Sequence, residues 1–265
     1  MTYETIQFAI GDGIGTLTLN RPQVMNALSS RMRAEITEAV QTLPDAARCL
    51  VITGAGRGFC AGQDLADPSV APDTTPGAAP KDLGQVIERF YRPLVQRLRS
   101  LPVPVVAAVN GVAAGAGANL ALNCDLVLAA RSASFIQAFS KIGLVPDTGG
   151  TWLLPRLVGR GKALGLTLLG DKLPAAEAEQ MGLIWRCVDD DTLAAEAAAL
   201  AERLAAQPSR ALVATRQALD EAQGLSLDGA LALEARLQSQ LGAAHDYQEG
   251  VAAFGQRRTP VFTDR

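Results

Sequence analysis

Two glycine-rich segments have a composition that would bring backbone N–H groups close to a ligand. Residues 58–65 (GFCAGQDL) and 110–119 (NGVAAGAGAN) each follow an apolar run, and the second leads into a helical pattern. Small residues let a ligand approach the backbone, and the first-turn N–H groups of a helix have no intrahelical partner. One N–H group from each segment would stabilise an oxyanion developing on a carbonyl group. Taken alone, each segment is more often a turn or a tight packing seam.

One carboxylate lies in a third glycine-containing segment, residues 143–150 (GLVPDTGG). The side chain of Asp147 could accept a proton as a general base. The alternative is structural, because Asp is a common helix N-cap and Asp147 stands just before Gly149, Gly150 and Thr151.

The chain lacks the residues that several other kinds of catalytic or binding site require. The only histidine is His245, which excludes a histidine triad and disfavours a multi-histidine metal site. Residues 54–59 (GAGRGF) imitate a dinucleotide-binding loop, but Phe59 stands where the third glycine is needed. The four cysteines are widely spaced and form no CxxC pair, so neither a zinc site nor a disulfide framework is predicted. A reducing cytoplasm is the expected location.

Composition narrows the class of protein. The chain has 265 residues, of which 48% are hydrophobic, and a net charge of −3, which suits a large core and argues against nucleic-acid binding. No signal peptide is expected at the N-terminus. Residues 103–122 are uncharged and about as long as a membrane span, but Pro104, Asn110, Asn119 and several glycines favour a buried strand followed by a buried helix. No membrane association is expected.

The elements that would position these residues alternate along the first half of the chain. Strands are predicted at residues 14–19 and around residues 51–52 and 105–106, with amphipathic helices at residues 32–43 and 83–101, the latter kinked at Pro93. Residues 67–81 contain four prolines and predict a mobile surface loop. Pro174 should open a short helix that Gly182 closes, and further helices are predicted at 193–206, 209–222 and 227–241. We therefore expect an α/β core over residues 1–192 and a helical region over residues 193–265.

At the level of these motifs the chain resembles the crotonase, or enoyl-CoA hydratase/isomerase, superfamily. The resemblance covers essentially the whole chain: residues 19–22 (LNRP) with 26–28 (NAL), residues 58–64, residues 110–111 with 115–117, and residues 149–151 through to Gly159. It implies a spiral of ββα units with a helical C-terminal oligomerisation region, and a homotrimer or hexamer. It also implies an acyl-CoA thioester substrate, in which coenzyme A is part of the substrate, with no separate cofactor and no metal.

The resemblance also implies the site. The oxyanion donors would be the backbone N–H groups of Gln63 and Ala116, and Asp147 would be the base. Contacts to the substrate would come from Val24, Ala61, Asp64, Leu65, Gly115, Asn119, Phe139 and Leu144. The hydratases of the family carry two catalytic glutamates where this chain has Asn119 and Phe139, neither of which can activate water, so the chain is predicted not to be a hydratase. Phe139 and Leu144 would form an apolar wall that raises the pKa of Asp147.

Residues 138–156, 182–185 and 247–254 resemble the branch of the family that isomerises the ring-1,2-epoxide of phenylacetyl-CoA to an oxepin. Three alternatives remain open at this point. The chain could be a plain 3-enoyl-CoA to 2-enoyl-CoA isomerase, a thioester hydrolase or dehalogenase with Asp147 as nucleophile, or a non-catalytic acyl-CoA-binding protein.

Overall fold

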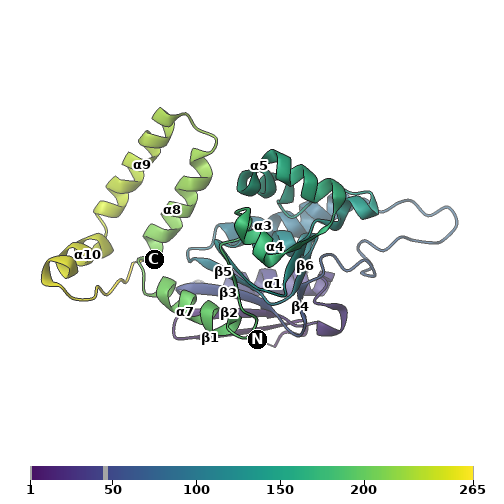
Figure 1. Cartoon of the computed structure of the whole chain (residues 1–265), viewed down its shortest axis with the longest axis horizontal. Helices are drawn as coiled ribbons and strands as arrows, with labels where there is room; N and C mark the ends of the chain where they lie inside the picture. The colour runs from purple at the N-terminus through teal and green to yellow at the C-terminus, as the bar shows by residue number, and fades with distance from the viewer. Residues whose placement is uncertain (1, 44–46, 265) are drawn as a thin grey trace.

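The computed structural model describes residues 2–43 and 47–264, and two sheets organise them (Figure 1). The larger sheet has the order β1-β2-β3-β5-β7-β10, in which β1 pairs antiparallel with β2 and the other neighbours are parallel. Its strands are Ile6–Gly11, Ile14–Leu19, Cys49–Gly54, Val105–Val109, Leu126–Ala130 and Arg186–Val188. The smaller sheet has the order β4-β6-β8-β9. Its strands are Gly58–Cys60, Val112–Ala114, Ser134–Ile136 and Lys172–Pro174.

From β3 to β8, consecutive strands alternate between the two sheets, which makes this part of the chain a spiral. The pairs β3/β4, β5/β6 and β7/β8 each give one strand to the larger sheet and the next to the smaller sheet. Helix α4 (Ala116–Leu122) follows β6 and is buried along its whole length. This confirms the predicted α/β spiral and brings the glycine-rich segments, which follow β3 and β5, side by side.

Burial patterns and a helix cap explain why several of the predicted strands and helices form. Strand β5 is buried on both faces, as in a parallel sheet covered on both sides, and β2 alternates between buried and more exposed positions. Helix α1 (Ser30–Thr42) begins at Ser29, whose hydroxyl accepts a hydrogen bond from the Met32 N–H at 3.2 Å. Residues 103–122 form β5, β6 and α4, not a membrane span, and no helix in the described part of the chain is long and apolar enough to cross a bilayer.

The helical segment around Pro93 is irregular one turn earlier than predicted. Helices α2 (Leu83–Val86) and α3 (Arg92–Arg99) are joined by a π-helical turn, η2 (Ile87–Tyr91), and Pro93 lies in the first turn of α3. A proline ring clashes with the carbonyl four residues earlier, and the widened turn removes that clash. The irregularity is therefore a π-turn that precedes Pro93 rather than a kink at it.

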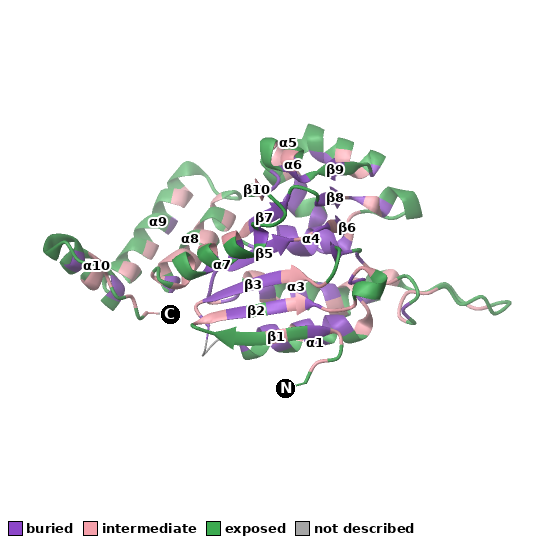
Figure 2. Ribbon diagram, turned by 60° about the horizontal axis from the view of Figure 1, so that its bottom comes forward, coloured by how far each residue is buried: buried purple, intermediate pink, exposed green. Residues whose placement is uncertain are grey.

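The C-terminal helices fall into two groups. Helix α7 (Leu193–Ala205) packs on β2, β3, β5 and β7, whereas α8 (Ser209–Ala222), α9 (Leu227–Gly242) and α10 (His245–Gln256) project from the body as an arm (Figure 1). Helix α10 and strand β1 were not predicted from the sequence. Ion pairs tie α8 to the body, with 2.6 Å between Arg99 and Asp220 and 2.9 Å between Arg216 and Asp125. Figure 2 shows that the central strands of the larger sheet are largely buried, whereas the edge strand β1 and most of the arm are exposed.

Three further elements complete the surroundings of the site. The five residues Ala138–Ile142 form the 3-10 helix η3, and α5 (Gly150–Leu169) follows with a break at Gly159. Helix α6 (Ala175–Gln180) begins after Pro174 and is followed by Gly182, as predicted. The segment between β4 and α2, which contains the proline-rich residues, consists of turns and bends and extends away from the body (Figure 1).

Candidate active site

A cavity of about 460 Å³ lies where the two glycine-rich segments meet the segment that carries Asp147. Most of its wall is apolar, with side chains from the loop after β4, from α2 and η2, and from η3 and the residues after it. These include Leu65, Val70, Val86, Ile87, Phe139, Ile142, Leu144 and Val145. The polar side chains of the lining are Gln63, Tyr91, Lys141 and Asp147. Asp147 is thus the only carboxylate among the described residues that line this cavity.

The two glycine-rich segments touch backbone to backbone. A Cβ atom on Gly62 would lie 2.7 Å from the Ala114 carbonyl oxygen and 3.4 Å from the Ala116 nitrogen, and Gly62 has a φ of +93°. Only glycine suits both the close approach and this backbone conformation. Gln63 and Ala116 consequently line the same cavity. Ala116 is the first residue of α4, so its N–H has no acceptor within the helix.

The carboxylate of Asp147 is half-buried, and its Oδ1 accepts a hydrogen bond from the Thr148 hydroxyl at 2.8 Å. Burial raises the pKa of Asp147, while this hydrogen bond and the charge of Arg33 act in the opposite direction. The side chain does not cap α5, because Gly149 occupies the N-cap position and no side chain provides a cap hydrogen bond. The structure therefore rules out the N-cap alternative and leaves the carboxylate facing the cavity with a raised basicity.

A buried arginine behind the cavity was not predicted. Arg33 is 1% exposed, and its Nη1 donates to the side-chain oxygen of Gln63. The Tyr91 hydroxyl donates to the same oxygen at 2.6 Å, and the Gln63 amide nitrogen donates to the Asp64 carbonyl at 2.9 Å. These three bonds fix the Gln63 side chain, and through it the backbone whose N–H is the candidate oxyanion donor.

Two hydroxyl groups connect the guanidinium group of Arg33 to the carboxylate of Asp67 by hydrogen bonds. Its Nη2 donates to the Ser30 and Ser69 hydroxyls at 3.1 and 3.0 Å, and both hydroxyls donate to Asp67, at 2.7 and 2.6 Å. Burial alone would raise the pKa of Asp67, but hydrogen bonds from Ser30 and Ser69 lower it overall. The sequence does contain a signal for Arg33: a charged residue stands three positions before Ile36, on the apolar face of α1.

The structure brings most of the sequence-predicted residues to this cavity. Besides Gln63, Ala116 and Asp147, the lining contains Ala61, Leu65, Gly115, Phe139 and Leu144. Val24, Asp64 and Asn119 are not among its lining residues. Val24 is 40% exposed in the turn η1 (Pro22–Val24), and Asp64 pairs with Arg21 at 2.8 Å.

Asn119 is fully buried beneath the backbone of Asp147, so the expected contact of Asn119 with the substrate is not supported by the structure. Asn119 is the fourth residue of α4. Its side chain points toward Gly150 at the start of α5 and away from the cavity.

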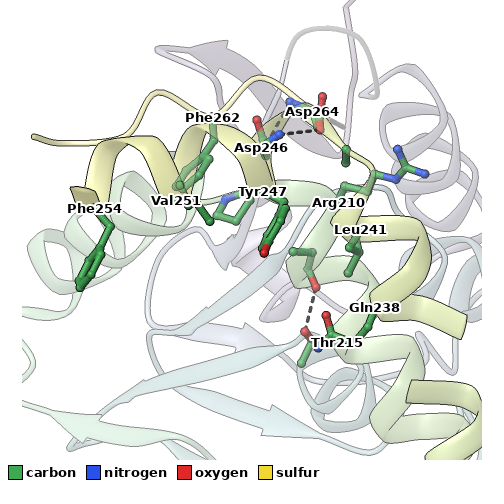
Figure 3. A pocket seen from close by; sticks show the side chains of 14 residues that line it. Arg210, Thr215, Gln238, Leu241, Asp246, Tyr247, Val251, Phe254, Phe262 and Asp264 are labelled. Carbon is green, nitrogen blue, oxygen red and sulfur yellow. Dashed lines mark hydrogen bonds between the residues drawn. The ribbon is translucent and has the colours of Figure 1, made fainter. Parts of the chain in front are cut away.

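A second cavity, of about 520 Å³, lies within the arm between α8, α9 and α10 (Figure 3). Its carboxylates accept hydrogen bonds from the backbone: Asp246 from the Thr263 N–H at 2.7 Å, and Asp264 from the Asp246 N–H at 3.0 Å. These bonds hold the C-terminal segment against α10. Tyr247, Val251 and Phe254 border this cavity, and all three are more than half exposed.

Comparisons with known proteins find relatives along nearly the whole chain. The family model described as Enoyl-CoA hydratase/isomerase matches residues 9–265. The chain is 53% identical over 264 residues to the 1,2-epoxyphenylacetyl-CoA isomerase of Escherichia coli, with 99% of each chain covered. It is 49% identical over 266 residues to a protein of Rhodobacter capsulatus named "Probable enoyl-CoA hydratase", with both chains fully covered. The crystal structure of an enoyl-CoA hydratase from Bacillus anthracis superposes with a TM-score of 0.90 at 29% identity, covering 99% of this chain and 100% of the other.

Proposed function

The chain belongs to the enoyl-CoA hydratase/isomerase family, and we propose that it isomerises an acyl-CoA thioester by moving a proton within the acyl group without adding water. The observation that carries this proposal is the single carboxylate of the cavity, Asp147, which shares it with the backbones of Gln63 and Ala116. One carboxylate is enough for an isomerisation, because the same group can take a proton from one carbon and return it to another.

In the proposed reaction the thioester oxygen accepts hydrogen bonds from the backbone N–H groups of Gln63 and Ala116. Asp147 removes a proton from the carbon next to the thioester carbonyl, and the two donors stabilise the resulting enolate. The electron pair moves through the conjugated system, and Asp147 returns its proton to a carbon farther along. Substrate and product therefore have the same composition. Coenzyme A is part of the substrate, and no other cofactor or metal takes part.

The lining of the cavity supports isomerisation over hydration. The ring of Phe139 lies beside the Gly115 turn, with its Cζ 3.7 Å from where a Cβ of Gly115 would be. Neither Phe139 nor the buried Asn119 offers a second acid or base that could manage the protons of an attacking water. The apolar wall made by Phe139, Leu144 and Val145 suits an unsaturated or aromatic acyl group. We propose the ring-1,2-epoxide of phenylacetyl-CoA as substrate, with 3-enoyl-CoA esters as the second candidate.

Three substrates test this function together. The purified protein is expected to convert the ring-1,2-epoxide of phenylacetyl-CoA and 3-hexenoyl-CoA into products of unchanged mass, followed by absorbance and mass spectrometry. It is expected not to hydrate crotonyl-CoA, because only one carboxylate is available. Robust hydration of crotonyl-CoA, seen as a mass increase of one water, would establish a hydratase. A trapped acyl-enzyme would establish a hydrolase, and tight binding without turnover a non-catalytic protein.

We also propose that the arm assembles copies of the chain into a trimer or hexamer. Its exposed apolar side chains include Leu227, Leu231, Tyr247, Val251 and Phe254, the last 88% exposed. Tyr247, Val251 and Phe254 share one face of α10, and an exposed apolar face of this kind is typical of an interface between proteins. Sedimentation velocity at micromolar concentration should show trimers or hexamers for the wild type and smaller species for Phe254→Glu. A wild type that sediments only as a monomer would contradict this proposal.

A further inference from the structure

Asn119 of α4 and Asn123, which caps the C-terminus of that helix, hold the backbone that carries the candidate base. The Asn119 Nδ2 donates to the Asp147 carbonyl oxygen at 2.8 Å, and the Asn123 Nδ2 donates to the Thr148 carbonyl oxygen at 2.9 Å. The Asn123 Nδ2 also donates to the Asn119 carbonyl oxygen at 2.7 Å. Asn119 is fully buried and Asn123 is 4% exposed, so these bonds are made away from solvent. Adjacent peptide groups of the Asp147 segment are thus attached to one helix.

The held backbone has an unfavourable conformation. Thr148 has a φ of +51°, in the left-handed region that β-branched residues rarely adopt, and Gly149 follows with a φ of +81°. A conformation of this kind persists only where its surroundings impose it. The turn also sets the direction of the base, since the Thr148 hydroxyl is the group that hydrogen-bonds the Asp147 carboxylate.

The orientation of the Asn119 amide is fixed on its other side. Its Oδ1 accepts a hydrogen bond from the Gln137 Nε2 at 2.9 Å, which leaves the Nδ2 to face Asp147. The backbone of Gly150 lies so close that a Cβ there would be 2.3 Å from the Asn119 Nδ2. A side chain at residue 150 would therefore displace the amide, which explains why glycine occupies that position.

We propose that Asn119 is a positioning residue that holds the Asp147 carboxylate in register with the backbone N–H of Ala116. Both Asn119 and Ala116 belong to α4, so a single short helix spans the oxyanion donor and the attachment point of the base. This inference rests on the proposed function, because it assigns to Asn119 an effect on the proton transfer that Asp147 performs. It does not assign Asn119 to substrate binding, since its side chain does not line the cavity.

The test compares two buried amides of the same network. Asn119→Leu keeps the approximate volume but removes the bond to the Asp147 carbonyl, whereas Gln137→Met removes only the partner of the Asn119 Oδ1. Because a displacement of about 1 Å can cost about 10²-fold in rate, we expect kcat for 3-hexenoyl-CoA to fall about 10- to 100-fold in Asn119→Leu with KM nearly unchanged. Gln137→Met should stay within about five-fold of the wild type, although it loses the hydrogen bond between the two amides that Asn119→Leu also loses. Asn119→Ser serves the same purpose if the leucine variant does not fold.

A double-mutant cycle with Asp147→Asn separates positioning from a general structural role. If Asn119 acts through Asp147, adding Asn119→Leu to Asp147→Asn should cause no further loss of rate, because interacting sites are not additive. Equal losses in Asn119→Leu and Gln137→Met, or losses that add to that of Asp147→Asn, would overturn the proposal while leaving Asp147 as the base. Full activity of Asp147→Asn alone would overturn both this inference and the proposed function.

Discussion

Replacing Asp147 by asparagine is expected to lower the rate of isomerisation by about 10²- to 10⁴-fold, the usual contribution of a general base. Asparagine keeps the size of the side chain and an oxygen that can accept the Thr148 hydroxyl, but it cannot take a proton. The measurement is kcat for the ring-1,2-epoxide of phenylacetyl-CoA and for 3-hexenoyl-CoA. Turnover within a few-fold of the wild type would exclude Asp147 as the base.

The same variant should fold as well as the wild type. Burial raises the pKa of Asp147, so this group contributes stability below its pKa in the unfolded chain, and loses that contribution as the pH rises through its pKa in the folded protein. At neutral pH the charged carboxylate is therefore mildly unfavourable, and a neutral amide should leave the thermal midpoint equal or slightly higher. Asp82→Asn is the matched control, because Asp82 caps α2 next to the cavity without lining it. Its activity should match that of the wild type.

The second large effect is expected from removing one backbone donor. Ala116→Pro deletes the N–H at the first position of α4, where the fixed φ of proline is tolerated. Losing one oxyanion donor typically lowers kcat by about 10²- to 10³-fold. The residue before it, Gly115, is a glycine with a φ of +51° and can adapt to the proline that follows.

Ala116→Gly is the control for this change, because it keeps the N–H and alters only the side chain. We expect its kcat to stay within about ten-fold of the wild type, since glycine in a helix costs only about 1 kcal/mol in stability. Circular dichroism and the affinity for free coenzyme A should be close to wild type in both variants. A folded Ala116→Pro enzyme with near-normal kcat would remove Ala116 from the oxyanion site.

Much of the fold could be predicted because its signals are local. The alternation of β2, the fully apolar β5 and the serine that caps α1 are each set by a few neighbouring residues. The π-turn before Pro93 could not be predicted in this way, because a proline within a helical pattern indicates an irregularity but not which turn absorbs it. Helix α10 and strand β1 were missed although each carries a local pattern: Tyr247, Val251 and Phe254 recur at helical spacing, and Ile6, Phe8 and Ile10 alternate as in a strand.

The site shows the same division. The glycines that mark the candidate oxyanion segments and the acid at residue 147 could be found from residue types and a family resemblance. The role proposed for Asn119 could not, because its hydrogen bond joins residues 28 positions apart and depends on the left-handed turn at Thr148. Arg33 had a signal in the sequence, a charge on an apolar helix face. Tyr91, whose ring centroid lies 5.0 Å from the Arg33 guanidinium carbon, comes from the distant turn η2.

The most direct test of the central claim isolates the first proton transfer. Phenylacetyl-CoA has acidic hydrogens next to its thioester carbonyl but neither a ring epoxide nor a 3-enoyl double bond to rearrange, so with it the enzyme can only remove and return a proton. In D₂O, proton NMR should show that the wild type exchanges these hydrogens for deuterium well above the rate in buffer, while Asp147→Asn does not. Equal exchange by the two proteins, or no exchange by the wild type above buffer, would contradict proton abstraction by Asp147.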